Sequence, residues 1–475
     1  MTSSSHVNRR TLIRRSAAAG ILAVPGVGVL SACASGGGGG DDGGQGGAEE
    51  KTAENPFGVD PDADVEVVIF DGGFGDEYAR DTAKLYEERW GDVELSSTQE
   101  ISQLMQPRLV AGSPPDMINN SGAHQMPHPT LIKDGQIADL TELFDAPSWD
   151  DPDVPVRDTL VPGTVEAGQY GGQESYHLNY TFTVHGTWYS RKLLHDVLEE
   201  EYPETWDEMI RVCEKAKRQE DVYGWTYAGQ HARYLSFTML PMMAKVGGAE
   251  VIEAIDRLEP NAWKHDAVVA VFQAFEEIAA RGLLLPGSPG IDHTDSQTEW
   301  ALGKALFLPC GSWVENESRE VIPEDFELAV KAPTGLDSSD ALPFGTLYAV
   351  AGEPFIVPAQ AANRAGGMEF LRAMLGRDSA RNFTEKVASL TCVQGAADGL
   401  SLPPGLTTAQ EAIEAAGEHI IAPRFRDWYA ELFIDHMGVA MGRMMAGDLT
   451  AEQATDQIQQ AADAVAADDS VVKYL

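Results

Sequence analysis

The chain has 475 residues, of which 74 are acidic and 34 are basic, so its formal net charge is −40 at pH 7. Nucleic acid and anionic lipid surfaces repel so acidic a chain, which excludes both as preferred partners. Roughly 410 residues follow the polar N-terminal region, too many for one core, so two domains are expected.

The first 32 residues have the composition of an export signal. They contain four arginines, no acidic residue and an apolar run from Ala17 to Leu30. This run is shorter than the about 20 residues that a membrane span needs. The segment Asn8–Ile13 contains Arg9-Arg10 and resembles the twin-arginine signal, although an arginine pair also arises by chance in a basic head. Residues 1–32 are therefore predicted to be a removed signal.

A cysteine stands where the signal ends. The segment Leu30-Ser31-Ala32-Cys33 resembles a lipobox, in which Cys33 would receive a diacylglycerol and become the first mature residue. The alternative is an ordinary cleaved signal with an incidental cysteine. Residues 35–47 are mainly Gly and Asp and have no side chain to build a core, so residues 33–56 are predicted to be a flexible tether.

Strands and helices alternate in the next part of the chain. Residues 65–70, 93–97 and 116–118 have the pattern of short strands, and residues 76–90 and 101–111 that of helices. This alternation predicts an α/β fold with a doubly wound, mostly parallel sheet and helices on both faces. Such sheets bind ligands at the carboxyl ends of their strands, which directs attention to residues 72–76 and 119–122.

The alternation continues to the C-terminus. Thr205 is a good N-cap, with Asp207 and Glu208 in the first turn of the helix that it begins. Further helices are expected at 192–200, 235–245, 261–281, 363–375, 380–386, 407–416, 428–446 and 451–466, and strands at 223–227, 305–308, 326–330, 348–350 and 355–357.

Several segments, taken in order, resemble the extracellular solute-binding proteins of sugar ABC importers, the maltodextrin-binding type. They are Trp188–Leu194, Thr205-Trp206-Asp207-Glu208, Gly303–Trp313, Pro358–Leu375 and Met445–Ala454. The resemblance covers nearly all of residues 57–470. It implies a two-lobed periplasmic-binding-protein-like fold, with lobe one at 57–168 plus 324–378 and lobe two at 169–323 plus 379–475.

The first lobe carries a narrower resemblance. Residues 70–76, 106–108 and 112–122 are similar to the N-acetylglucosamine/diacetylchitobiose-binding lipoproteins of Gram-positive importers. This similarity implies a monomer, lipid-anchored at the extracellular face of the membrane, that captures a small carbohydrate and delivers it to the permease subunits of an ABC importer. Another oligosaccharide or a polyol is the alternative ligand. No cofactor or metal is expected.

Sugar binding requires flat aromatic groups for the C–H faces of a pyranose and planar polar groups for its hydroxyls. Trp313 follows a strand end and is the first candidate for stacking, the alternative being a core tryptophan. Asn120 and Ser121 would bond hydroxyls, or would satisfy a turn. The remaining candidates are Phe74 in the glycine-rich loop, Tyr180, Tyr227 and Tyr234 near the expected cleft, and Glu353, which is either an acceptor or a solvated loop charge.

An exported enzyme such as a glycoside hydrolase is the remote alternative. The chain has no H-E-x-x-H, G-x-S-x-G or P-loop motif, and a pair of carboxylates means little among 74 acidic residues. We therefore expect no catalytic residue. Beside Cys33 the chain has Cys213, Cys310 and Cys392, without the spacing of a zinc site. A Cys310–Cys392 disulfide and unpaired buried thiols are both compatible with export.

Overall fold

The computed structural model describes residues 50–122 and 125–474. The chain divides into residues 1–45 and 46–475, and only the second unit is considered below. The predicted signal, Cys33 and most of the predicted tether lie outside the described residues.

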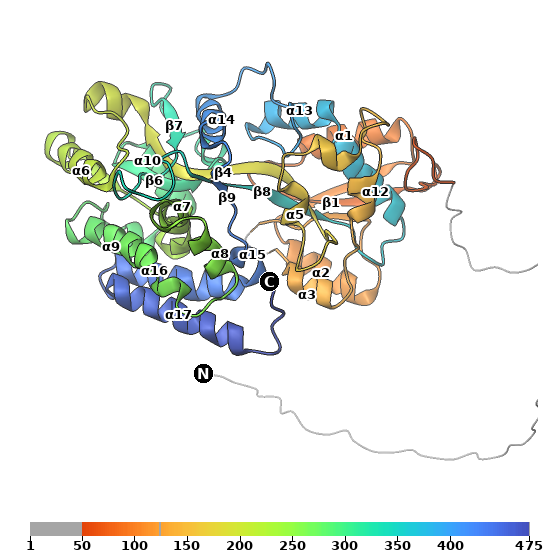
Figure 1. Ribbon diagram of the computed structural model, residues 1–475. Helices are drawn as coiled ribbons and strands as arrows, with labels where there is room; N and C mark the ends of the chain where they lie inside the picture. The colour runs from red at the N-terminus through yellow and green to blue at the C-terminus, as the bar shows by residue number, and fades with distance from the viewer. Residues whose placement is uncertain (1–49, 123–124, 475) are drawn as a thin grey trace, which may run out of the picture. The chain divides into compact units, whose positions relative to one another are not determined.

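In the described part of the chain, nine strands form one sheet in the order β2-β1-β3-β8-β4-β6-β5, with β7 beside β4 and β9 beside β8 (Figure 1). The pairs β1–β2, β1–β3, β5–β6 and β8–β9 are parallel. The pairs β3–β8, β4–β8, β4–β6 and β4–β7 are antiparallel. The strands are β1 Val65–Phe70, β2 Val93–Thr98, β3 Met117–Asn119, β4 Leu178–Ser190, β5 Tyr223–Trp225, β6 Ala305–Gly311, β7 Leu328–Lys331, β8 Leu347–Ile356 and β9 Ile420–Ile421.

Helices cover both faces of the β1–β3 half of this sheet. Val67 and Ile69 of β1 belong to one cluster of buried side chains, and Val68, which points the other way, belongs to a second. We call these two clusters the first core. The helices of this half are α1 Glu77–Glu87, α2 Ile101–Ala111, α3 His128–Lys133, α4 Thr141–Asp145, α5 Thr164–Ala167, α12 Arg364–Met374 and α13 Arg377–Val387.

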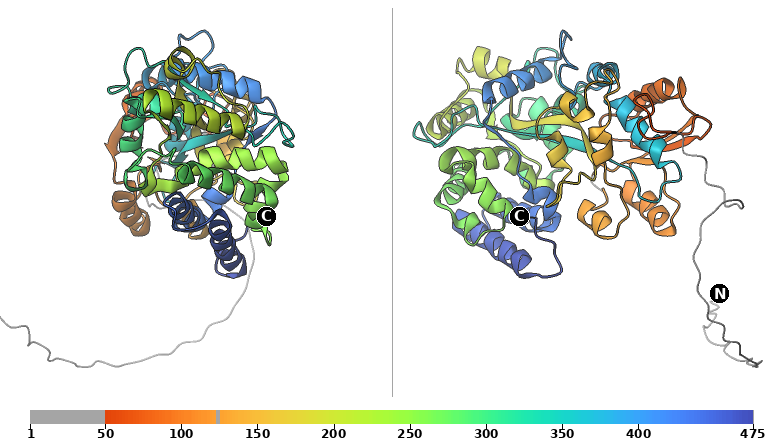
Figure 2. Two further views of the ribbon diagram at one scale, coloured as in Figure 1. Left: turned by 90° about the vertical axis from the view of Figure 1, so that its left-hand side faces the viewer. Right: turned by 45° about the vertical axis from the view of Figure 1, so that its right-hand side comes forward.

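The β5–β6 half repeats the arrangement. Leu306 and Phe307 of β6 lie in one buried cluster and Leu308 in another, and we call these two clusters the second core. Its helices, which Figure 2 shows from two sides, are α6 Trp206–Glu220, α7 Ser236–Gly247, α8 Glu250–Asp256, α9 Asp266–Ala280, α10 His293–Ala301, α11 Val314–Glu317, α14 Pro404–Ala416, α15 Phe425–Trp428, α16 Gly438–Met445 and α17 Ala451–Ala467.

Two long strands run from one core into the other. Leu178 and Phe355 lie in the first core, whereas Val184 and Ala349, on the same strands β4 and β8, lie in the second. The sequence pattern did not reveal β4, and it suggested two strands, 348–350 and 355–357, where the structure has the single strand β8. Gly352-Glu353-Pro354 resembles a break, yet pairing with β4 carries the strand through it.

Several predicted helices are confirmed and others divide. Thr205 and Glu208 form the capping box of α6, and α2 has the expected bounds. The helix expected at 261–281 separates into the short 3-10 turn η4 Ala262–Lys264 and α9, because His265 caps α9 by accepting a hydrogen bond from the Ala267 N–H. The stretch 428–446 divides around the π-helical turn η6 Leu432–Met437, and 192–200 is the π-helical turn η2 Lys192–Val197. The remaining 3-10 turns are η1 Val156–Thr159, η3 Gly229–Leu235 and η5 Ser288–Gly290.

The three described cysteines, Cys213, Cys310 and Cys392, are buried and unpaired. Of the two alternatives left open by the sequence, a Cys310–Cys392 disulfide and unpaired buried thiols, the structure has the unpaired thiols. Cys310 lies in the second core and Cys392 in the first, so each packs as a small apolar group among different neighbours.

A buried lysine fastens the loop between β7 and β8. Lys245, at the end of α7, is fully buried, donates through Nζ to the carbonyl of Pro333 and accepts at its own carbonyl from the Leu342 N–H at 3.0 Å. Burial lowers the pKa of this ammonium to about 7, although Asp340 and Glu204 favour the charged form.

We expect Lys245→Met to abolish the part of the pH dependence of stability that Lys245 causes. The unfolded chain holds this proton up to about pH 10.4, whereas the folded chain releases it above about pH 7. Raising the pH through this window should therefore stabilise the native protein by roughly 1.4 kcal/mol per pH unit relative to the variant. Chemical unfolding of both proteins at several pH values measures this difference.

Lys304→Met is the matched control, because the Lys304 side chain is 49% exposed and pairs with Glu299 at 2.6 Å. If the unfolding free energies of Lys245→Met and the native protein change with pH in the same way, Lys245 does not lose its proton on folding.

Candidate functional site

The middle of β8 is less buried than either end of the strand. Residues Val350–Pro354 are half-buried, whereas the residues of β8 before and after them are buried. Polar and aromatic side chains approach this stretch from the ends of strands in both halves of the sheet. This half-exposed segment and its neighbours form the candidate site.

The loops after β1 and β3 lie at the same edge of the sheet, since the two strands are parallel. Asn119 ties them together: its Oδ1 accepts from the Phe70 N–H at 3.1 Å, and its Nδ2 donates to the Pro354 carbonyl at 3.2 Å. The N–H of Asn120 donates to the same carbonyl at 2.8 Å. The first half of the site is thus fixed to β8 by one side-chain and one backbone hydrogen bond to the Pro354 carbonyl.

Ser121 and Glu353, both candidates from the sequence, are brought together here. The Ser121 hydroxyl donates to Glu353 Oε2 at 2.8 Å. Burial raises the pKa of the Glu353 carboxyl, and the hydrogen bonds from Ser121 and Asn119 oppose this shift without cancelling it. Glu353 also has a φ of 57°, a left-handed conformation that costs free energy in a residue other than glycine.

Asn120 has a different role from the one expected. Its Oδ1 accepts from the Met126 N–H at 2.8 Å, and its Nδ2 donates to the Met126 carbonyl at 2.9 Å and to His128 Nε2 at 2.9 Å. The fully buried amide therefore has no free group for a ligand. The turn interpretation holds, and direct contact by Asn120 is not supported.

Phe70 lies at this edge and was missed from the sequence. A Cβ at Gly72 would lie 2.2 Å from its ring, and one at Gly122 would lie 2.4 Å from it, so both glycines leave room for the half-buried ring. Phe74 instead packs edge-on against Phe383 at 5.4 Å, on the first core. The alternation of glycine with aromatic residues in 70–75 was the available signal.

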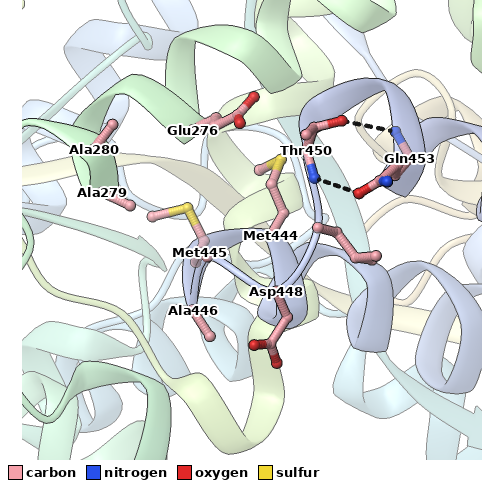
Figure 3. A pocket seen from close by; sticks show the side chains of 11 residues that line it. Glu276, Ala279, Ala280, Met444, Met445, Ala446, Asp448, Thr450 and Gln453 are labelled. Carbon is pink, nitrogen blue, oxygen red and sulfur yellow. Dashed lines mark hydrogen bonds between the residues drawn. The ribbon is translucent and has the colours of Figure 1, made fainter.

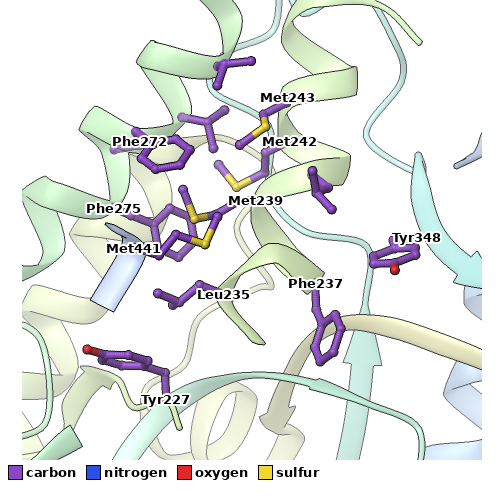
Figure 4. Close-up of a cluster of buried hydrophobic side chains, with 14 of the residues drawn as sticks. Tyr227, Leu235, Phe237, Met239, Met242, Met243, Phe272, Phe275, Tyr348 and Met441 are labelled. Atoms are coloured by element: carbon purple, nitrogen blue, oxygen red, sulfur yellow. The ribbon is translucent and has the colours of Figure 1, made fainter. Parts of the chain in front are cut away.

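Tyr180 and Tyr227 do not reach the site. Tyr180 is buried in the first core, where its hydroxyl donates to the Met374 carbonyl at 3.0 Å. Tyr227 is buried in the second core (Figure 4), with 1% of its surface exposed. Both are core residues because neighbouring elements cover them, and the sequence does not contain that information.

Trp313 is half-buried in the second half of the site. Its indole lies over Gly311, where a Cβ would meet the ring at 2.1 Å. Tyr234 stands 6.0 Å away between ring centroids, so two of the predicted aromatic residues are neighbours. Phe237 at 5.7 Å and His185 at 5.4 Å support the indole edge-on.

His185 and Arg426 lie beneath these rings and were not foreseen. His185 is stacked on Tyr348 at 4.4 Å, and Arg426 donates to the Tyr348 hydroxyl at 2.7 Å. Burial lowers the pKa of His185, so this ring is neutral at neutral pH. The two halves also touch, because the Asn316 amide donates to the carbonyl of Gly73.

A cavity of about 320 Å³ lies elsewhere, between α9 and the turn from α16 to α17 (Figure 3). None of the site residues above lines it. Among the described residues no cluster of His, Cys, Asp or Glu has the arrangement of a metal site. The chemistry available at the candidate site is therefore stacking on aromatic rings and hydrogen bonding to a hydroxyl and a carboxyl group.

Residues 79–381 match the family described as Bacterial extracellular solute-binding protein. The chain belongs to this family. The Diacetylchitobiose binding protein NgcE of Streptomyces coelicolor is 34% identical to it over 98% of both chains. The Multiple sugar-binding protein of Streptococcus mutans is 25% identical over 36% of this chain and 41% of its own.

Solved structures agree on the fold of this solute-binding protein. The apo form of RafE from Streptococcus pneumoniae has a TM-score of 0.65 at 17% identity, covering 84% of this chain and 97% of its own. A chitin oligosaccharide binding protein has a TM-score of 0.64, also at 17% identity, with coverages of 82% and 94%. The expected two-lobed α/β fold is thereby confirmed. No helix in residues 50–122 and 125–474 is both long and apolar enough to span a membrane.

We expect Gly122→Ala to disturb the site through Phe70. Gly122 has a φ of 88°, and an added methyl group would collide with the Phe70 ring. Gly163→Ala is the matched control, because Gly163 has a φ of 90° and open space around its Cα. Urea unfolding should show Gly122→Ala to be less stable than Gly163→Ala by about 1–3 kcal/mol, the cost of overpacking. Equal stabilities would mean that the Phe70 ring moves aside without cost.

Proposed function

We propose that this protein captures a sugar, N-acetylglucosamine or a short β-1,4 oligomer such as diacetylchitobiose, and delivers it to an ABC importer. The observation that carries this proposal is the 34% identity, over 98% of both chains, to a diacetylchitobiose binding protein. The family of the chain consists of solute-binding proteins. We infer that this member, too, binds its ligand without converting it.

The chemistry of the site supports a pyranose ligand. Trp313 and Tyr234 offer aromatic surface on the side of the second core, and Ser121 and Glu353 offer polar groups on the side of the first. A pyranose has apolar C–H faces and a polar rim, and it is bound best between such surfaces. The Glu353 carboxyl would accept from a hydroxyl or an acetamido N–H.

We infer that the protein consists of two lobes that close over the sugar. Phe326, Leu328 and Val330 pack in the second core, whereas Phe383 and Val387 pack in the first. These contacts favour assigning residues 324–352 to the second lobe and α13 to the first, in place of the boundaries expected from the sequence. The contact of Asn316 with Gly73 would then join the lobes in the closed state.

We propose, from the N-terminal pattern, a monomer held at the outer face of the membrane by lipid on Cys33. The membrane would be of the Gram-positive type, and the Arg9-Arg10 pair favours export by the twin-arginine route. The Gly/Asp tract would give the folded part freedom to reach the permease.

Calorimetry with a sugar panel tests the function. The protein should bind diacetylchitobiose and its close relatives, and a preference for an unrelated oligosaccharide or a polyol would replace the proposed ligand. Trp313→Ala should weaken binding about 5- to 150-fold, since stacking contributes roughly 1–3 kcal/mol.

Trp263→Ala is the control for this substitution, because Trp263 is fully buried in the second core. It should lower the melting temperature strongly, as large core truncations cost about 3–5 kcal/mol. If Trp313→Ala lowers the melting temperature as much as Trp263→Ala does and leaves the affinity for sugar unchanged, Trp313 is a packing residue.

Cys33→Ala tests the anchor. The variant should lose lipid labelling and appear in the medium or remain unprocessed, because the thiol that carries the diacylglycerol is gone. Fractionation of cells that express either form measures this, and equal membrane retention of the variant would reject the lipobox.

A further inference from the structure

Two buried histidines meet beside the site and have no part in the function proposed above. His128, the first residue of α3, and His177, just before β4, stack with their ring centroids 4.4 Å apart and an interplanar angle of 26°. They are 7% and 4% exposed. Near them the chain passes from the first core to the second, because β4 begins at Leu178.

The hydrogen bonds of Asn120 fix the protonation state of His128. The Met126 N–H can bond only to an oxygen, so the atom of Asn120 that it meets must be Oδ1. The atom facing His128 Nε2 at 2.9 Å is therefore the donor Nδ2. His128 must accept at Nε2, which requires the neutral ring with its proton on Nδ1.

Groups from several elements surround the pair. The Tyr170 hydroxyl lies 3.2 Å from His177 Nε2, and the Tyr170 ring packs against that of Tyr474. Arg424 opposes a positive charge on His177, whereas Asp427, the neighbour of Arg426 on α15, favours one on His128. Burial outweighs this attraction and lowers the pKa of His128 to about 4.

His128 is coupled to the candidate site by a short path. The Asn120 amide binds the N–H and the carbonyl of Met126, and Ser121, the residue after Asn120, donates to Glu353. A proton on His128 Nε2 would set an N–H against the Asn120 N–H. The hydrogen bond would be lost, and Asn120 would have to turn away from Met126 or from His128.

We propose that neutral His128 is a positioning residue of the sugar site, and that its protonation releases Asn120, displaces the adjacent Ser121 and weakens sugar binding. This inference rests on the proposed function. His128 itself does not touch the sugar but acts through Asn120. Acid thus favours release, whereas neutral pH favours capture.

Two substitutions at His128 test separately whether this residue must accept the hydrogen bond from Asn120 and whether it must bind a proton. In His128→Phe the ring shape is retained but the acceptor is lost, so affinity for diacetylchitobiose at neutral pH should fall about tenfold, the typical effect of a lost buried hydrogen bond. His128→Gln places an amide oxygen near the position of Nε2 and should restore most of that affinity. Melting temperatures of both variants check that they fold.

The pH profile is the readout that a purely structural role would not change. The dissociation constant of the native protein should rise about twofold between pH 7 and about pH 4, and about tenfold by about pH 3, as expected when the free form binds, with a pKa of about 4, a proton that the complex excludes. His128→Gln should lack this rise, and any dependence that remains belongs to other groups such as Glu353. Identical profiles of the native protein and His128→Gln would overturn the proposal, as would unchanged affinity in His128→Phe.

Nitrogen NMR of the histidine rings tests the inference without sugar. His128 should carry its proton on Nδ1 at neutral pH, with Nε2 unprotonated. A proton on Nε2 would overturn the role of His128 whatever the protein binds. Failure of the native protein to bind any sugar of the panel, together with the expected NMR signature, would reject the proposed function alone.

Discussion

The structure depends on the antiparallel pairing of β4 with β8. Each of the two strands has one end in the first core and the other end in the second. A slip of one residue would turn Leu178 and Phe355 out of the first core, and Val184 and Ala349 out of the second. One register therefore sets both halves of the sheet. The half-buried middle of β8, Val350–Pro354, lies between the buried ends of this strand.

The first half of the site uses most of its amides to hold the backbone. Asn119 and Asn120 are buried, and a buried amide without hydrogen bonds would cost more free energy than a ligand contact could return. Their groups bond to Phe70, Pro354, Met126 and His128. Recognition is left to Ser121 and Glu353, which the amides hold beside β8. The inferred effect of His128 arises because this frame contains a group that titrates.

The second half of the site is aromatic. Trp313 and Tyr234 lie on a layer that includes Phe237, His185 and Tyr348, so the exposed rings have little freedom to turn. Below this layer, Met239, Met242 and Met441 fill the space between α7, α9 and α16 (Figure 4). A rigid aromatic surface opposite a polar frame suits a ligand with apolar faces and a hydroxylated rim, which is the basis of the proposed sugar site.

The sequence alone determined the features that depend on near neighbours. The bounds of α2, the capping box of Thr205 and Glu208, and the positions of the loops after β1 and β3 follow from local patterns of side chains. Only the tertiary structure decided that β4 is a strand, that β8 is continuous, that Tyr180 and Tyr227 are covered, and that Asn120 serves its own loop. A pattern of apolar residues indicates that a side chain is buried, but which elements cover it, and which distant groups satisfy its polar atoms, depends on packing between segments far apart in the chain.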